Sequence, residues 1–174
     1  MSDKNIIVDD PIVGVGNYLR RLGVVSLGPT FGNDNYISAK KVFKAGFDPD
    51  FKNWGIVFSG IAPKTNIDVD KLVEDGKYWD FLGNTPEELE HRRMLGSQWL
   101  KFCQDHPDKL CKGGKATFTV LTKQDEKVAA DLGNVFVALV FVVDGAQLGA
   151  AVHHIDFNFT LHAQNRHRIL YPQR

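Results

Sequence analysis

A nine-residue stretch near the C-terminus, Val135–Val143, limits the folds open to this chain more than any other feature. It reads VFVALVFVV, so a strand here would be apolar on both of its faces. Burying the second face, roughly 150–250 Å² of apolar surface, is worth several kcal/mol at about 25 cal/mol per Å². We therefore expect a β-strand covered on both sides, by a helix, a second sheet or another subunit.

The segment that follows, His154–Gln164, shows a different pattern. Its apolar and polar residues alternate with the period of a half-exposed strand. In such a strand His154 and Asp156 lie about 6.6 Å apart, close enough to share a metal ion, and His162 lies roughly 27 Å further along. A pair without a visible third ligand is a weak metal signature, so we predict no metal and no other cofactor. A polar sheet face, or one that meets another subunit, is the alternative for these side chains.

Local signals outside this region predict further strands and one substantial helix, with six to nine strands in total. Thr85-Pro86-Glu87-Glu88 combines an N-cap, proline at the first helical position and a capping box, and predicts a helix to about Gln104. Asp68–Glu74 is predicted to be a shorter helix capped by Asp68. The predicted strands are 36–38, 41–44, 54–61 and 116–121.

Two groups of arginines are candidates for contacts with a partner or with phosphate. Arg92 and Arg93 lie on the basic face of the predicted helix, and Arg166 and Arg168 lie in the basic C-terminal segment. A solvated helix face and a disordered tail are the alternative interpretations. In the docked alternative, Ile169-Leu170-Tyr171 would pack on a neighbour while the arginines meet acidic groups.

Composition excludes some function classes. Lysine plus arginine equals aspartate plus glutamate at 21 each, so the 174-residue chain lacks the surplus positive charge of a general nucleic-acid coat. A chain without self-repulsion associates readily. The sequence has no GxSxG or HExxH motif, and no zinc spacing around Cys103 and Cys111, so we expect two reduced thiols and no enzyme. We also expect no signal peptide and no membrane association.

The order of the C-terminal segments resembles the closing pair of strands in the jelly-roll coat proteins of small icosahedral viruses. GNVFVALVFVV is followed by a short glycine-bearing link and a last strand, AAVHHIDFNFTL. The resemblance implies a mainly β protein, an antiparallel β-sandwich of jelly-roll type with one or two inserted helices. Residues 1–174 would be a single domain, with 1–35 as an extended arm and 165–174 as a C-terminal tail.

One departure from that family concerns nucleic acid. Its arms are usually arginine-rich, whereas residues 1–35 hold only Lys4, Arg20 and Arg21 against four aspartates. Genome binding would then rest on the C-terminal arginines or on another protein.

Three hypotheses follow. The first is a self-assembling structural subunit, a viral capsid or other virion protein, found in a virion or the host cytoplasm. Its partners would be copies of itself, reached through the arm, sheet and tail. The second is a metal-dependent cupin-like enzyme that uses His154 and Asp156. The third is a ligand- or carbohydrate-binding sandwich that stacks sugars on Trp54, Trp79 or Trp99.

Overall fold

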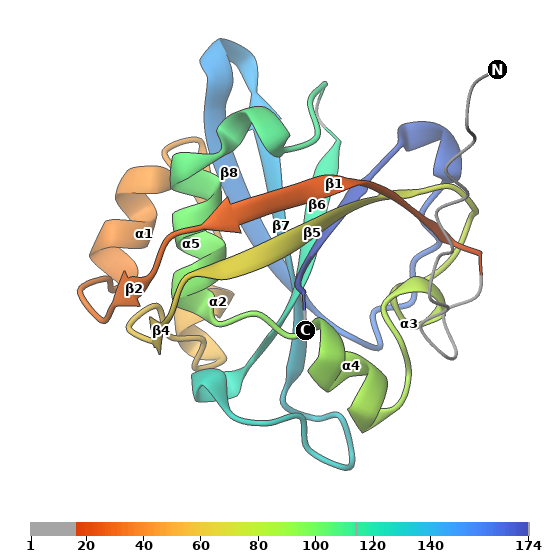
Figure 1. The fold of residues 1–174 in the computed structure, drawn as a ribbon, viewed down its shortest axis with the longest axis horizontal. Helices are drawn as coiled ribbons and strands as arrows, with labels where there is room; N and C mark the ends of the chain where they lie inside the picture. Colours follow the sequence, from red (N-terminus) through yellow and green to blue (C-terminus); the bar gives the residue numbers. More distant parts are fainter. Residues whose placement is uncertain (1–16, 114, 174) are drawn as a thin grey trace, which may run out of the picture.

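A seven-stranded mixed sheet organises the chain in the computed structural model, which describes residues 17–113 and 115–173 (Figure 1). Across the sheet its strands are β1 (Leu19–Leu27), β5 (Thr65–Leu72), β9 (Arg168–Pro172), β6 (Ala116–Thr122), β7 (Val135–Val143), β8 (Gln147–His154) and β3 (Gly46–Phe47). Neighbours are antiparallel except for β6 with β9 and β3 with β8. Strands β2 (Thr30–Phe31) and β4 (Ile61–Ala62) pair separately, as a two-stranded ribbon.

Helices cover both faces of the sheet. Figure 1 shows α1 (Tyr36–Val42), α2 (Asp50–Asn53) and α5 (Gly96–Asp105) on one side, and α3 (Tyr78–Phe81) and α4 (Pro86–Arg92) on the other. Short 3-10 turns occur at Pro107–Lys109, Lys123–Asp125, Asp144–Ala146 and Ala163–Asn165. The buried apolar residues accordingly form two clusters, one on each side of the sheet.

Strand β7 has the bounds predicted from the sequence and is covered on both faces. Its even-numbered residues Phe136, Ala138 and Val140 join the cluster under α5. On the opposite face Val135 and Val137 join the cluster under α3 and α4. Helices of the same chain cover the first half of the strand, whereas Leu139 and residues 141–143 are half-buried.

The β-rich fold class is confirmed, and the jelly-roll sandwich is not. The described residues form one large mixed sheet with five helices packed on its two faces, where we expected two facing sheets and one or two helices. Two apolar faces on one strand require two covering layers, but they do not determine whether each layer is a sheet or a set of helices.

Residues 1–16 of the expected arm lie outside the described residues, whereas the rest of 1–35 holds β1 and β2. The strands predicted at 36–38 and 41–44 are wrong, because α1 occupies 36–42. Asn35 is its N-cap, since its side chain accepts hydrogen bonds from the backbone N–H groups of Ile37 and Ser38 at 2.9 and 3.0 Å. That cap was the sequence signal we overlooked.

Two further predictions in the first half of the chain are wrong. Residues 54–60 do not form a strand, and Ile61 belongs to the two-residue strand β4. Gly55 adopts a φ of 75°, and Ile56 and Phe58 enter the core from an irregular segment. The predicted helix at 68–74 falls largely within β5, where Ile67 and Val69 face the core under α5. Long-range pairing with β1 and β9 outweighs the local helix-capping signal of Asp68.

The helix predicted from Thr85 to Gln104 begins as expected but divides into α4 and α5. The Thr85 hydroxyl accepts from the backbone N–H of Glu88, as the capping box requires. Residues 93–95 are extended, and the N–H of Met94 donates to the carbonyl of Val120 at 2.9 Å. This backbone contact with β6 replaces one helical turn and redirects the chain into α5.

The C-terminal third differs most from expectation. The strand predicted at 154–164 is wrong, because β8 runs from Gln147 to His154 and the chain then turns away from the sheet. The segment expected as a tail contains β9, which lies between β5 and β6 within the sheet. Ile169, Leu170 and Tyr171 are buried in this strand, so these apolar residues pack inside their own chain.

Candidate functional site

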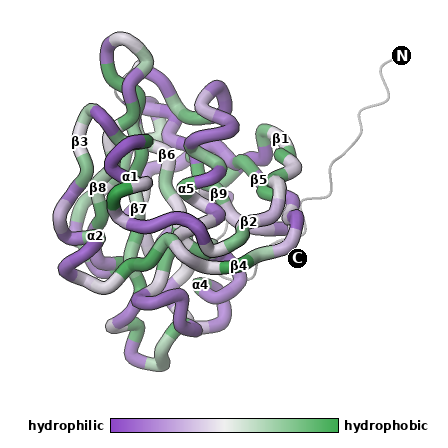
Figure 2. The backbone as a smooth tube through the Cα atoms, turned by 90° about the vertical axis from the view of Figure 1, so that its left-hand side faces the viewer, coloured by the Kyte–Doolittle hydropathy of each residue, from purple (hydrophilic) through white to green (hydrophobic). Residues whose placement is uncertain are grey.

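Large apolar side chains are exposed at one end of the molecule, on and beside the β2–β4 ribbon. Phe31 and Ile61 are directly opposite each other in the ribbon and are 71% and 76% exposed. Ile37, in the first turn of α1, is also exposed, and α1 lies at the same end of the molecule as β2 (Figure 1). We call these three residues the ribbon end. Figure 2 views the molecule from this side, with α1, β2 and β4 towards the viewer.

The ribbon is fixed to the body of the protein through its inward-facing residues. Thr30 and Ala62, the second cross-strand pair, are both buried. The Thr30 hydroxyl donates to the carbonyl of Gly60 at 2.8 Å and lies 3.2 Å from the hydroxyl of Ser97 on α5. Since Thr30 of the inward pair is hydrogen-bonded to α5, the ribbon that carries the outward pair is anchored to the core.

A second group of exposed aromatic residues lies beside α3. Phe157 and Phe159 follow β8 and are 44% and 55% exposed, with ring centroids 6.3 Å apart. Trp79 is exposed on α3 itself. We call Trp79, Phe157 and Phe159 the platform end. Figure 1 places α3 and the ribbon at opposite ends of the longest molecular axis.

Contacts with β8 and with α3 hold the platform end in place. The ring of Phe157 stacks on that of His153 with a centroid separation of 4.1 Å. The hydroxyl of Tyr78 lies 2.8 Å from Nδ1 of His153 and hydrogen-bonds to it. Burial lowers the pKa of His153 and raises that of Tyr78, which favours the neutral forms of both groups.

Asp75 holds the other end of the loop that follows β8, at His162 and Ala163. One carboxylate oxygen accepts from the backbone N–H of Ala163 at 2.7 Å, and the other lies 3.3 Å from Nδ1 of His162. The hydrogen bond from Ala163 is the main cause of the lowered pKa of Asp75. The loop after β8 is therefore attached to the segment before α3 at more than one point.

A buried charged cluster lies between α4 and the β5–β9 strands. Arg92 is 2% exposed, and its guanidinium carbon lies 4.2 Å from the ring centroid of Tyr171. The Tyr171 hydroxyl donates to Oδ2 of Asp70 at 2.7 Å. Burial raises the pKa of Asp70 and lowers that of Arg92, and their mutual attraction opposes both shifts. Nε and Nη1 of Arg92 and Oδ1 of Asp70 have no protein hydrogen-bond partner among the described residues.

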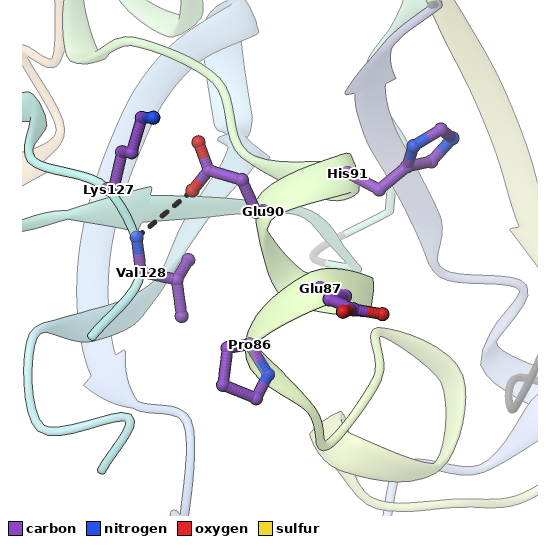
Figure 3. Close-up of a pocket in the computed structure, with 6 residues that line it drawn as sticks. All are labelled: Pro86, Glu87, Glu90, His91, Lys127 and Val128. Atoms are coloured by element: carbon purple, nitrogen blue, oxygen red, sulfur yellow. Dashed lines mark hydrogen bonds between the residues drawn. The ribbon is translucent and has the colours of Figure 1, made fainter. Parts of the chain in front are cut away.

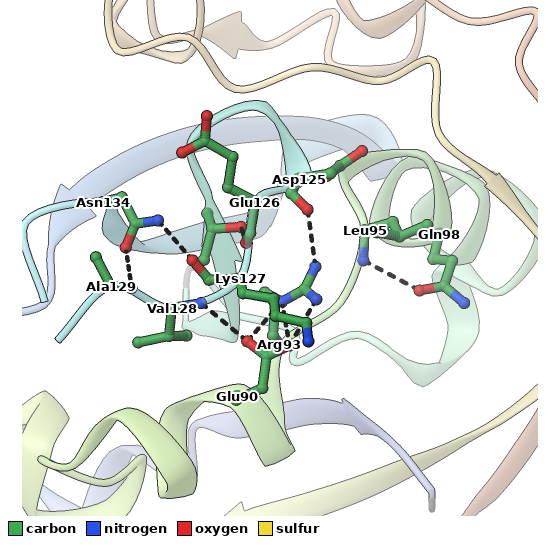
Figure 4. A network of polar contacts seen from close by, with 11 residues as sticks. Glu90, Arg93, Leu95, Gln98, Asp125, Glu126, Lys127, Val128, Ala129 and Asn134 are labelled. Atoms are coloured by element: carbon green, nitrogen blue, oxygen red, sulfur yellow. Dashed lines mark hydrogen bonds and ion pairs between the residues drawn. The ribbon is translucent and has the colours of Figure 1, made fainter.

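A surface hollow of about 370 Å³ lies beside α4, lined by Pro86, Glu87, Glu90, His91, Lys127 and Val128 (Figure 3). Figure 3 shows Glu90 turned towards Val128, whose backbone N–H donates to the carboxylate at 3.0 Å. Figure 4 shows that Glu90 also binds the guanidinium of Arg93, with a shortest N–O distance of 2.6 Å. Through its contacts with Val128 and Arg93, the Glu90 carboxylate holds the 123–129 segment against α4.

The metal candidates His154 and Asp156 do not share a strand. His154 is the last residue of β8, and its ring packs 4.2 Å from Trp54 and 5.2 Å from Phe136, measured between centroids. Asp156 follows in an exposed turn. Within the described ranges no three His, Cys, Asp or Glu residues are placed to hold a metal ion.

The four candidate arginines are dispersed. Arg92 is buried and therefore does not present its guanidinium to a surface partner. Arg93 binds Glu90 and the carbonyl of Asp125, and Arg168 donates to the carbonyl of Lys109 at 2.5 Å. Arg166 is exposed, and its role as a partner or phosphate contact stays a prediction.

The tryptophans proposed as sugar platforms occupy three environments. Trp99 is fully buried, whereas Trp54 is half-buried and stacks on Phe136. Of these three side chains, Trp79 is the most exposed. Cys103 and Cys111 are both buried and form no disulfide, and burial raises the pKa of each thiol.

Comparisons with protein-family models, with curated proteins and with solved structures found no match for this chain. Among the described residues, no helix has both the length and the apolar character needed to cross a membrane.

Sequence reasoning named Trp79 as a possible stacking surface but missed the other residues of the two exposed ends. Ile61 lies at the end of a predicted strand, and Phe157 and Phe159 lie on the apolar face of a predicted strand that does not form. Alternation indicates which residues share a face, but it does not show which face is covered. The local sequence contains no signal that would have revealed the exposure of these side chains.

Proposed function

We propose that this protein is a self-assembling structural subunit. The observation that carries the proposal is the exposure of large apolar side chains at two opposite ends of one molecule. Among the described residues the exposed large apolar side chains are Leu22, Val24, Phe31, Ile37, Ile61, Trp79, Phe157 and Phe159. Six of these eight belong to the ribbon end or the platform end.

Exposed apolar groups of this size are costly in a protein that stays monomeric. Single exposed apolar side chains are common, whereas grouped and rigidly held ones are typical of interaction sites. The zero net charge of the chain adds no long-range repulsion between copies. A surface that hides these groups against another copy would remove them from water.

A viral capsid or another virion component, in a virion or the host cytoplasm, is the specific form of this proposal. Its support is the antiparallel pairing of β7 with β8, which matches only the first part of the strand pair in the likeness to jelly-roll coat proteins, because β8 ends at His154. A jelly roll has a second large sheet facing the first, and the described residues form only one large sheet, so the jelly-roll architecture is part of the proposal. If nucleic acid is bound, the exposed Arg166 is the candidate contact.

The test is the mass of the purified full chain as a function of concentration. Multi-angle light scattering from about 1 to 500 μM should show an average mass that rises steadily, and negative-stain images should show rings, tubes or shells. A mass equal to one chain throughout that range would overturn the proposal. Dilution of assembled samples provides the control, because specific association reverses whereas aggregation does not.

A further inference from the structure

We infer that the self-association is head-to-tail, with the ribbon end of one copy seated on the platform end of the next. This inference rests on the proposed function and names its interface. The ribbon end supplies the paired side chains of Phe31 and Ile61, which project from a two-stranded ribbon. The platform end supplies the aromatic rings of Phe157 and Phe159, of which that of Phe157 stacks on His153.

The occupant of each surface follows from the charges around it. Exposed lysines flank the residues of the ribbon end in sequence: Lys40, Lys41, Lys44 and Lys64. The half-buried Asp34 opposes them, as does the half-buried Asp125, whose carboxylate lies beside Gly60. Exposed acids surround the platform end: Glu74, Asp75 and Asp156, with the half-buried Lys77 and the exposed His162 opposing them. Basic and acidic rims attract each other when different ends meet, and like rims repel when equal ends meet.

The position of the two surfaces determines the kind of assembly. Because they lie at opposite ends of the molecule, each copy can bind one neighbour at each end at the same time (Figure 1). A head-to-tail contact of this kind generates a ring when the rotation between copies closes, and an open filament when it does not. A two-fold dimer would instead use the same end of both copies.

The experiment uses one double variant for each end. Phe31→Ser with Ile61→Ser truncates the cross-strand pair of the ribbon end, and Phe157→Ser with Phe159→Ser truncates the two phenylalanines of the platform end. Ile37 and Trp79 are left in place. Each variant alone should stay at the mass of one chain over the range in which the wild-type protein assembles, with association at least about tenfold weaker. An equimolar mixture should form a complex of two chains and grow no further, since only one intact pair of ends remains.

Controls separate loss of the interface from loss of the fold. Leu22→Ser truncates an exposed apolar residue outside both ends and should assemble as the wild type does. Each variant should unfold cooperatively with an unchanged circular dichroism spectrum. If the Phe157 change disturbs its stacking on His153, Phe159→Ser alone replaces the double variant.

The outcomes distinguish this inference from the proposed function. If either double variant forms dimers by itself, or if the mixture forms no two-chain complex, the head-to-tail inference is overturned. If both variants assemble as fully as the wild type, the interface lies elsewhere, and the proposed function stands without it. If the wild-type protein remains a single chain, both fail.

Discussion

Replacing Arg92 with methionine should destabilise the fold more than the loss of any surface arginine. The guanidinium is almost fully enclosed, lies over the ring of Tyr171 and interacts with the buried carboxylate of Asp70. Methionine retains much of the side-chain volume but leaves that carboxylate without its cation. The two groups attract each other but form no direct ion pair among the described residues, so the cost should lie below the range of about 3–5 kcal/mol typical of breaking a buried ion pair. The contact with Tyr171 accounts for roughly 0.5–2 kcal/mol of that loss.

Urea unfolding at neutral pH measures this cost, with Arg20→Met, an exposed arginine on β1, as the matched control. The control should change the free energy of unfolding by less than about 0.5 kcal/mol. Combining Arg92→Met with Asp70→Asn should recover at least about 1 kcal/mol relative to the sum of the two single changes. A cost of Arg92→Met below about 1 kcal/mol, or strict additivity in the double variant, would refute the assignment of a buried charged pair.

The pH dependence of the same variant follows from the raised pKa of Asp70. A carboxyl group whose pKa is raised by folding contributes stability below its unfolded value, and that stability is lost as the pH rises through its folded value. Removing Arg92 raises this folded pKa further, because the guanidinium lowers it in the wild type. The cost of Arg92→Met should therefore be smaller near pH 4 than near pH 7, and an equal cost at both pH values would contradict the reasoning.

Two further predictions concern other parts of the fold. Gly96→Ala should lower the free energy of unfolding by about 2 kcal/mol or more, because the added Cβ would lie 2.0 Å from the carbonyl oxygen of Val57. Gly23→Ala is the control: its added Cβ would have no atom within 4 Å, so it should be nearly neutral in the same denaturation assay. Burial lowers the pKa of His167 in the folded protein. The neutral imidazole therefore contributes stability at pH values above its unfolded pKa, and this stability is lost as the pH falls through the folded pKa. In thermal melts from about pH 7 to pH 5, the melting temperature should decline less for His167→Gln than for the wild type.

The parts of the fold that could be predicted are segments in which every residue favours the same local structure. Val135–Val143 is apolar on both faces, and no arrangement that leaves one face in water accounts for that pattern. Thr85 and Glu88 likewise determine where α4 begins, because their reciprocal hydrogen bonds are local. Such signals depend on neighbours in the sequence and need no knowledge of the rest of the chain.

The remainder depended on contacts between distant segments. The division between α4 and α5 is associated with Met94 bonding to Val120 and with the close approach of Gly96 to Val57, neither of which is visible locally. Residues 155–161 alternate as a strand would, yet Leu161 pairs with Gly76 instead of extending the sheet. The exposed ends could not be predicted for the same reason, since the exposure of Phe157 depends on where this loop is attached.

Hydrogen–deuterium exchange at low and high protein concentration tests head-to-tail assembly most directly. Amides of the ribbon segments 30–32 and 60–62, and of the platform segment 157–160, should exchange more slowly at high concentration, both groups to a similar degree. Amides of β7 should exchange slowly at both concentrations, because helices of the same chain cover this strand. Unchanged exchange in either end segment at a concentration where the measured mass exceeds one chain would contradict the account.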